Sequence, residues 1–125
     1  MSKLTCVVTV VASVMFAGCS SGPPPAKEFA SGARAPSAAE LTAALHGKSF
    51  TYSPGSLRTD YAAQGNGIVV YYGAGNSDSG TWRAEDGRVC FQFKVLPSGC
   101  NDIRYVGKDL YLKRMNGEVV RLGLR

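Results

Sequence analysis

Apolar and polar positions follow three different patterns along this chain. From Leu4 to Gly18 the residues are almost continuously apolar. From Ser20 to Ala35 the chain is rich in Ser, Gly, Pro and Ala, and Phe29 is its one large apolar side chain. Beyond Pro36 a short helical period is followed by an alternation of period two, which is typical of half-buried strands. The pattern predicts an apolar leader, a linker and one folded domain made mainly of strands.

The predicted helix runs from about Ala38 to His46. Ser37 and Glu40 have the spacing of a capping box, in which each side chain satisfies a backbone amide at the helix start. Two leucines one turn apart form a narrow apolar stripe, and Gly47 is a residue type that commonly ends helices. We expect this stripe to pack against the strands that follow.

The rest of the domain alternates in short runs separated by turns. The predicted strands lie in the stretches KSFTYS, GIVVYYG, GTWRAE, RVCFQFKV, CNDIRYVG, DLYLKRM and EVVRLGL. Asp86–Gly87 and Asn116–Gly117 are dipeptides that favour hairpin turns, and the alternation of RVCFQFKV places Val89 and Val95 on one face. This spacing predicts a mainly β fold: one short N-terminal helix followed by a meandering antiparallel sheet, curled or closed into a small barrel.

The leader has the order of a secretory signal peptide: the basic residue Lys3, an apolar core and small residues at the exit. Its apolar run of about 15 residues is shorter than the ~20 that a membrane-spanning helix needs. A buried amino-terminal helix is the structural alternative, but the run has no polar face. We therefore predict a signal peptide over residues 1–18.

The end of the leader, Phe16–Cys19, resembles the lipobox of bacterial lipoprotein precursors, in which the cysteine is acylated and becomes the new amino terminus. The family prefers Leu where this chain has Phe16. The resemblance implies lipid attachment at Cys19, and Ser20 in place of an Asp implies the outer membrane, with the domain facing the periplasm or the surface. Ordinary signal cleavage near Ala17, which leaves Cys19 free, is the alternative.

Segment boundaries follow from this interpretation. After the signal peptide, residues 19–36 hold the lipid-attachment cysteine and a linker whose composition predicts disorder, because it buries too little apolar surface to offset chain entropy. Residues 37–125 form the small β-domain. The membrane, contacted through the N-terminal lipid, is the first predicted partner.

The cysteines sort by segment. Cys6 leaves with the signal peptide and Cys19 takes lipid, so Cys90 and Cys100 remain in the domain. Export to an oxidising compartment favours a structural disulfide between this pair. Two thiols and the single His46 do not have the spacing of a metal site, and the thiols do not have the spacing of a redox motif. We predict no metal and no cofactor.

The net charge of the chain excludes few classes of binding partner. Loss of residues 1–18 removes one charge, Lys3, so the net charge falls from +5 to +4 (13 basic minus 9 acidic residues). This modest excess is compatible with attraction to lipopolysaccharide, phospholipid or a cell-wall polymer. Nucleic acid is excluded as a partner by the predicted compartment.

A longer pattern, SGTWRAEDGRVCFQF followed by GCNDIRYVGKDLYL and NGEVVRL, resembles the DUF995-like family of small secreted or lipid-anchored proteobacterial proteins. The resemblance covers roughly Leu45 to Leu124, and in the opening LHGKSF stretch Ser49 replaces a Thr of the family. It implies an exported β-fold and no activity. The matching signature positions are Gly80, Trp82, Asp86, Gly87, Cys90 and Cys100.

No catalytic residue is predicted. His46 has no Ser, Asp or Cys partner beside it in the sequence, and Asp86 is explained by the hairpin turn. The chain is therefore not expected to be an enzyme. The aromatic residues best able to contact a partner are Trp82, Tyr71, Tyr72 and Tyr105, although packing in the core or on a sheet face explains each of them better.

The sequence thus predicts a lipid-anchored cell-envelope protein that acts as a non-enzymatic binding or structural module, with an envelope protein or the cell wall as a candidate partner. One alternative is an inhibitor of lysozyme. Against it, the stretches taken as loops, 73–80 and 98–102, carry only Asp78 and Asp102, whereas a binder of a basic enzyme needs acidic groups. The other alternative is a barrel that binds a small ligand.

Overall fold

The computed structural model describes residues 26–125, so the predicted signal peptide and Cys19 lie outside the described residues. No helix within residues 26–125 has the length and apolar character needed to cross a membrane. The elements are α2 (Ala38–Leu45), β3 (Ser49–Ser53), β4 (Arg58–Tyr61), β5 (Gly67–Tyr72), β6 (Asn76–Glu85), β7 (Arg88–Phe93), β8 (Gly99–Val106), β9 (Asp109–Lys113) and β10 (Val119–Leu124).

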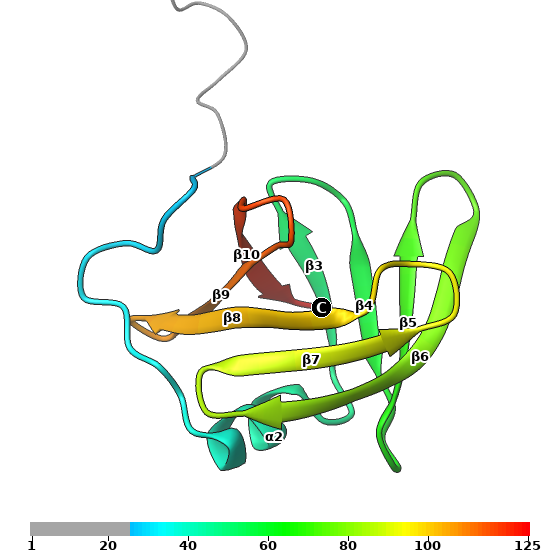
Figure 1. Cartoon of the computed structure of the whole chain (residues 1–125), viewed down its shortest axis with the longest axis horizontal. Coiled ribbons are helices and arrows are strands. Elements are labelled where there is room, and N and C mark those ends of the chain that lie inside the picture. The colour runs from blue at the N-terminus through cyan, green and yellow to red at the C-terminus, as the bar shows by residue number, and fades with distance from the viewer. Residues whose placement is uncertain (1–25) are drawn as a thin grey trace, which may run out of the picture.

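The eight strands form a closed antiparallel barrel in which each strand pairs with its neighbours in sequence (Figure 1). Closure comes from β10, which pairs with β9 on one side and with β3 on the other. Because consecutive strands alternate in direction, the β3–β4, β5–β6, β7–β8 and β9–β10 loops share one end of the barrel. The predicted fold class is confirmed.

Helix α2 closes the other end of the barrel. Its capping box is formed as predicted, since the Ser37 side chain accepts from the Glu40 amide and the Glu40 carboxylate accepts from the Ser37 amide. Leu41 and Leu45 are fully buried among the inward side chains of the strands. Asp86 in the β6–β7 turn accepts the first amide of the helix at 2.8 Å, which fixes the helix against the barrel.

Strand β6 is long because it bends between two neighbours. Its first half pairs with β5 and its second half with β7, and the two ladders overlap at Gly80 and Thr81. A Cβ at Gly80 would collide with the carbonyl oxygen of Gln92 in β7. A glycine is therefore required where the strand turns the corner of the barrel.

The prediction of the strands needs correction at three points. Strand β4 was not expected, because its sequence RTDY is short and half polar. The stretches taken as loops are partly strand: residues 76–80 belong to β6 and 99–102 to β8. Val95, which the alternation placed with Val89 on one face, lies beyond the end of β7 in the β7–β8 loop and is 76% exposed.

Residues 26–36, which we call the N-terminal strap, lie against the barrel. Arg34 exchanges two backbone hydrogen bonds of 2.8 Å with Tyr105, and the Val119 amide donates to the carbonyl of Ala26 at 2.8 Å. The disorder expected for this part of the linker is therefore not observed.

The reason for this order is an unpaired stretch of β8. The β7–β8 ladder ends at the pair Arg88–Asp102, so the same edge of β8 lacks a strand partner at Tyr105. The strap supplies backbone partners there, and Arg34 also lies over the Tyr105 ring at 4.9 Å. Backbone hydrogen bonds of this kind need no apolar side chains, so the composition of the linker could not predict them.

Cys90 and Cys100 occupy directly opposite positions on β7 and β8 and form the predicted disulfide. Replacing both with Ala should lower the free energy of unfolding by about 2–3 kcal/mol, because the bond closes a short loop in the unfolded chain. Urea unfolding followed by circular dichroism measures this difference. A reductant should destabilise the wild type by the same amount and leave the Ala variant unchanged. Equal stability of the wild type and the Ala variant without reductant would contradict the prediction.

Candidate functional site

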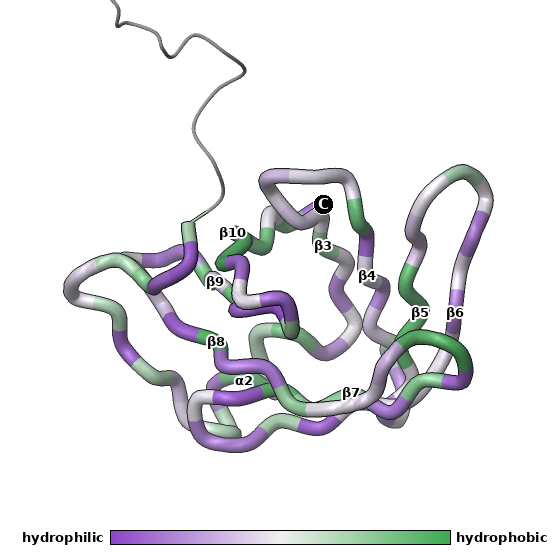
Figure 2. Tube along the Cα trace, turned by 45° about the horizontal axis from the view of Figure 1, so that its top comes forward, coloured by the Kyte–Doolittle hydropathy of each residue, from purple (hydrophilic) through white to green (hydrophobic). Residues whose placement is uncertain are grey.

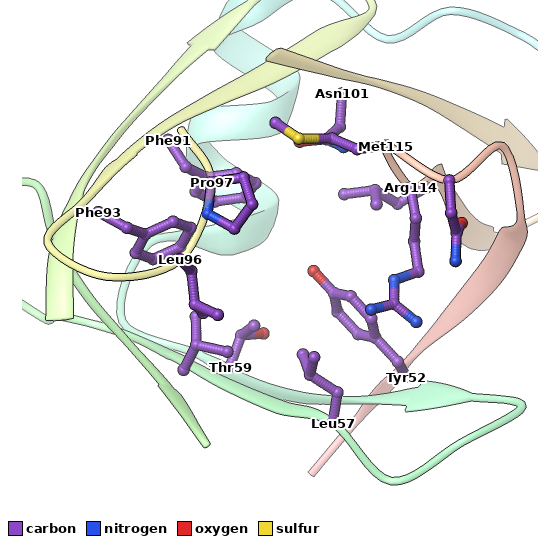
Figure 3. A pocket seen from close by; sticks show the side chains of 13 residues that line it. Tyr52, Leu57, Thr59, Phe91, Phe93, Leu96, Pro97, Asn101, Arg114 and Met115 are labelled. Atoms are coloured by element: carbon purple, nitrogen blue, oxygen red, sulfur yellow. The ribbon is translucent and has the colours of Figure 1, made fainter. Parts of the chain in front are cut away.

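The end of the barrel opposite α2 is open and leads into a cavity of about 280 Å³ (Figure 3). Three loops form its rim: β3–β4, β7–β8 and β9–β10. Inward side chains of the strands form its walls and floor. The lining residues are Tyr52, Leu57, Thr59, Val70, Phe91, Phe93, Leu96, Pro97, Asn101, Leu112, Arg114, Met115 and Asn116.

Two aromatic rings and several aliphatic side chains make most of this cavity apolar. Phe91 and Phe93 stack with ring centroids 5.4 Å apart on the wall that β7 provides. Leu57 and Leu96 approach from the β3–β4 and β7–β8 loops (Figure 3). An apolar body is therefore the part of a ligand that the interior of this cavity favours.

Polar groups line the side of the cavity opposite Phe91 and Phe93. The Tyr52 hydroxyl points into it, and the Arg114 guanidinium lies beside the Tyr52 ring (Figure 3). Burial raises the pKa of Tyr52 to about 12, although the positive charge of Arg114 acts in the opposite direction. The hydroxyl is therefore neutral and able to donate at physiological pH.

Arg114 has only a weak ionic partner. Its nearest carboxylate oxygen, on Glu118, lies 4.0 Å away, and the Arg114 side chain is 39% exposed. At this exposure an ion pair of that length adds little stability. The guanidinium can therefore turn to an anion at the mouth without breaking a strong contact.

Two further polar residues line the cavity. Thr59 is buried, and within residues 26–125 its Oγ1 has no hydrogen-bond partner. Asn101 donates from Nδ2 to the carbonyl of Lys113 at 3.1 Å, which ties β8 to the end of β9. Thr59 thus offers an unused hydroxyl to a bound molecule, whereas Asn101 mainly supports the wall.

Asp78 holds the β7–β8 loop in place over the cavity. It is 7% exposed, and its Oδ2 accepts the amides of Val95 and Leu96, each at 2.8 Å. The Leu96 amide, followed by those of Val95 and Ser79, holds the pKa of this carboxyl below its usual range. A single buried carboxylate thus replaces strand pairing where the chain leaves β7.

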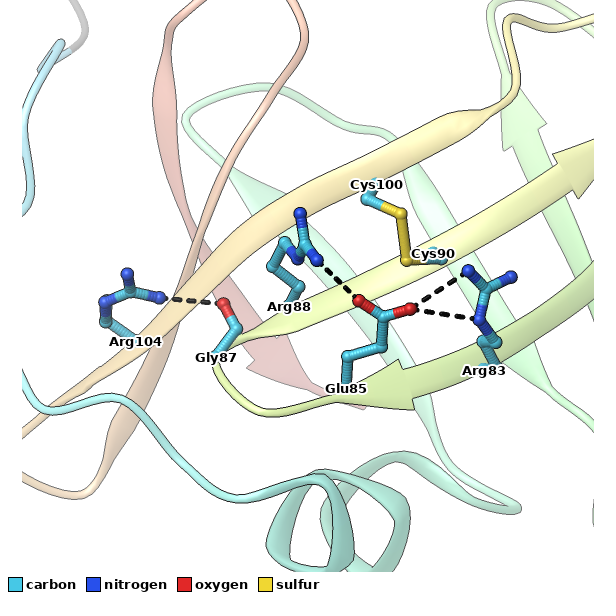
Figure 4. A network of polar contacts seen from close by, with 7 residues as sticks. All are labelled: Arg83, Glu85, Gly87, Arg88, Cys90, Cys100 and Arg104. Carbon is cyan, nitrogen blue, oxygen red and sulfur yellow. Dashed lines mark hydrogen bonds and ion pairs between the residues drawn. A yellow bond between two sulfur atoms is a disulfide. The ribbon is translucent and has the colours of Figure 1, made fainter.

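The outer face carries a second polar cluster, next to the disulfide (Figure 4). Glu85 accepts from Arg83 at 3.0 Å and from Arg88 at 2.7 Å, and the Arg83 hydrogen bond is the main cause that lowers the Glu85 pKa. The sulfurs of Cys90 and Cys100 lie near this carboxylate but are bonded to each other. Disulfide sulfurs are poor metal ligands, so the cluster is a network of surface ion pairs.

The four aromatic residues predicted to contact a partner lie apart from the cavity. Trp82 is only 5% exposed and packs edge-on against Tyr61, so it is a core residue. Tyr72 and Tyr105 are partly buried against the core. Tyr71 is 41% exposed, beneath the Arg58 guanidinium at 5.0 Å. Of the four, only Tyr71 presents much of its ring to the surface.

The sequence interpretation missed the residues that form the cavity. The alternation in KSFTYS puts Tyr52 on the same strand face as Phe50, but it does not distinguish a ring that fills the core from one that borders a cavity. Arg114 lies in a hairpin turn, where charged residues are common. His46 follows α2 at the closed end, so it is remote from the cavity.

No protein-family model, curated protein or solved structure matches this chain significantly. The resemblance to the DUF995-like proteins and to lipoprotein precursors therefore stays a prediction. What the chain can bind has to be inferred from the cavity itself.

Replacement of Asp78 with Asn should destabilise the protein at neutral pH, because an amide cannot accept the loop amides as a carboxylate does. The pKa of the Asp78 carboxyl is lower in the folded protein, so its charge stabilises the fold in full at pH values above the ordinary aspartate pKa of about 4. This contribution to the free energy of unfolding is lost as the pH falls through the lower pKa of the folded state. Urea midpoints should therefore differ clearly at about pH 7 and converge below about pH 3.

Asp102→Asn is the matched control, since Asp102 is an exposed aspartate on β8. It should change the midpoint little at either pH. A difference between wild type and Asp78→Asn that stays constant with pH would show that the Asp78 charge does not hold the loop.

Proposed function

We propose that this protein is a non-enzymatic binding module of the cell envelope, and that the open end of its barrel binds a small amphiphile with an apolar body and an anionic head. The observation that carries the proposal is the pairing of an apolar cavity with Arg114 and the Tyr52 hydroxyl at its mouth. Apolar walls supply affinity, and a few placed polar groups fix orientation.

The size of the cavity limits the ligand. Cavities that enclose drug-sized molecules measure about 300–1,000 Å³, and this one, at about 280 Å³, lies just below that range. It suits a small molecule or one end of a longer chain. Because the head group would stay near the rim, the apolar body behind it has to fit within this volume.

The envelope location rests on the leader. The predicted signal peptide over residues 1–18 and the predicted acylation of Cys19 support an exported, outer-membrane protein held by lipid. The disulfide suits an oxidising compartment. A tethered binding module is the simplest function that joins these features to the cavity.

The lysozyme-inhibitor alternative is less well supported. A loop that binds a basic enzyme needs free carboxylates, but Asp78 turns inward and accepts three backbone amides. The rim of the barrel instead carries the cations Lys94 and Arg114.

Binding of decanoate tests the proposal. Decanoate and decanol share one alkyl chain and differ in the head group, so displacement of anilinonaphthalene sulfonate by each separates apolar from ionic recognition. With residues 20–125, Arg114→Gln should weaken decanoate about tenfold, the effect of losing one charge-assisted hydrogen bond, and leave decanol nearly unchanged. Val70→Phe, which fills the cavity, should weaken both.

Arg121→Gln is the control, because Arg121 is an exposed arginine on β10 that does not line the cavity. It should bind both probes as the wild type does. The proposal fails if neither probe displaces the dye from the wild type, or if Val70→Phe binds both as tightly as the wild type does. Circular dichroism of each variant separates lost binding from lost folding.

A further inference from the structure

The rim of the open end exposes large apolar side chains. Val95 in the β7–β8 loop is 76% exposed and Met115 in the β9–β10 loop is 54% exposed. In Figure 2 part of the β7–β8 loop has the colour of hydrophobic residues. Val95 has no role in the walls of the cavity, so its exposure is not explained by ligand binding.

Charges on this rim are few and mainly positive. In the four loops at the open end, residues 54–57, 73–75, 94–98 and 114–118, the charged residues are Lys94, Arg114 and Glu118. Exposed apolar side chains flanked by cations are the composition of surfaces that sit at the interface of an anionic bilayer. Cations near such a surface strengthen its attraction to the anionic head groups.

The chain also enters the barrel at this end. Ala26, the first described residue, pairs with Val119, which begins β10 directly after the β9–β10 loop. Lys113 lies 3.6 Å from Glu28 in the same strap. Cys19, the predicted lipid-attachment residue, precedes Ala26 by seven residues, which span at most about 25 Å.

We propose that the rim of the open end, with Val95 and Met115 at its surface, docks on an anionic phospholipid bilayer, so that the mouth of the cavity faces the membrane. Three independent observations support a membrane as the occupant: the exposed apolar rim, its positive charge and the entry of the chain at the same end. Membrane docking does not require the cavity to be filled, so it can hold or fail separately from ligand binding.

Quenching of an introduced tryptophan by brominated acyl chains tests this orientation. The full chain is reconstituted in vesicles of phosphatidylethanolamine and phosphatidylglycerol with Met115→Trp at the rim, or with Lys108→Trp in the β8–β9 turn at the closed end. Trp82, the one native tryptophan, is buried and contributes the same background to both. Quenching should be several-fold stronger at position 115 than at 108.

The apolar and ionic parts of the contact are tested separately. Val95→Asp in the Met115→Trp protein should reduce quenching several-fold, whereas Gln64→Asp, in an exposed loop at the closed end, should not. Phosphatidylcholine vesicles, or salt at about 0.5 M, should also reduce quenching, because exposed charges are then screened. Circular dichroism and the urea midpoint check that each variant is folded.

Equal quenching at positions 115 and 108, or none at 115, would overturn the proposal. Absence of quenching, together with a concentration-dependent shift in the emission of the tryptophan introduced at the rim, would identify the rim as an interface between copies instead. Loss of decanoate binding with quenching intact would remove the proposed ligand and leave the docking surface in place.

Discussion

Closure of the barrel by β10 is the constraint on which the other features depend. Since β10 pairs with both β3 and β9, no strand of the ring is left as a long free edge, and inward side chains face a space of fixed width. An eight-stranded barrel is just wide enough for its own side chains to fill. At one end Leu41 and Leu45 of α2 complete that filling. Within residues 26–125 no helix covers the other end, and the cavity lies there.

Buried polar groups then decide the shape of the open end. The β7–β8 loop has no ladder to hold it, and Asp78 supplies the missing acceptors for Val95 and Leu96. A buried carboxylate with several amide donors is stable only as the anion, so the loop position is linked to ionisation. Leu96 forms part of the cavity wall, and for this reason the same contact that stabilises the loop also sets the volume available to a ligand.

Local sequence signals were sufficient for much of the fold. The capping box, the Asp86–Gly87 turn and the alternation predicted α2 and most strands, because each depends on neighbours along the chain or across one ladder. The disulfide pair was predicted in another way: Cys6 was assigned to the signal peptide and Cys19 to the lipid, which left Cys90 and Cys100. Strand β4 was missed since RTDY has too few residues to show a period. The cavity was missed for a different reason: alternation tells which side chains face inward, but the space left between Tyr52 and Phe93 depends on the width and closure of the whole ring.

The strap is ordered along one path by its contacts with the barrel, although its composition predicts only disorder. Its backbone bonds run from Val119 at the open end, past Tyr105, to Gly87 beside α2 at the closed end. If Cys19 carries the predicted lipid, the anchor is attached on the side of the open end, although the first helix of the domain is at the closed end. If the strap were free, the barrel could turn either end to a surface. Because the strap is fixed on the barrel, the end at which the chain enters is also the end at which the cavity opens.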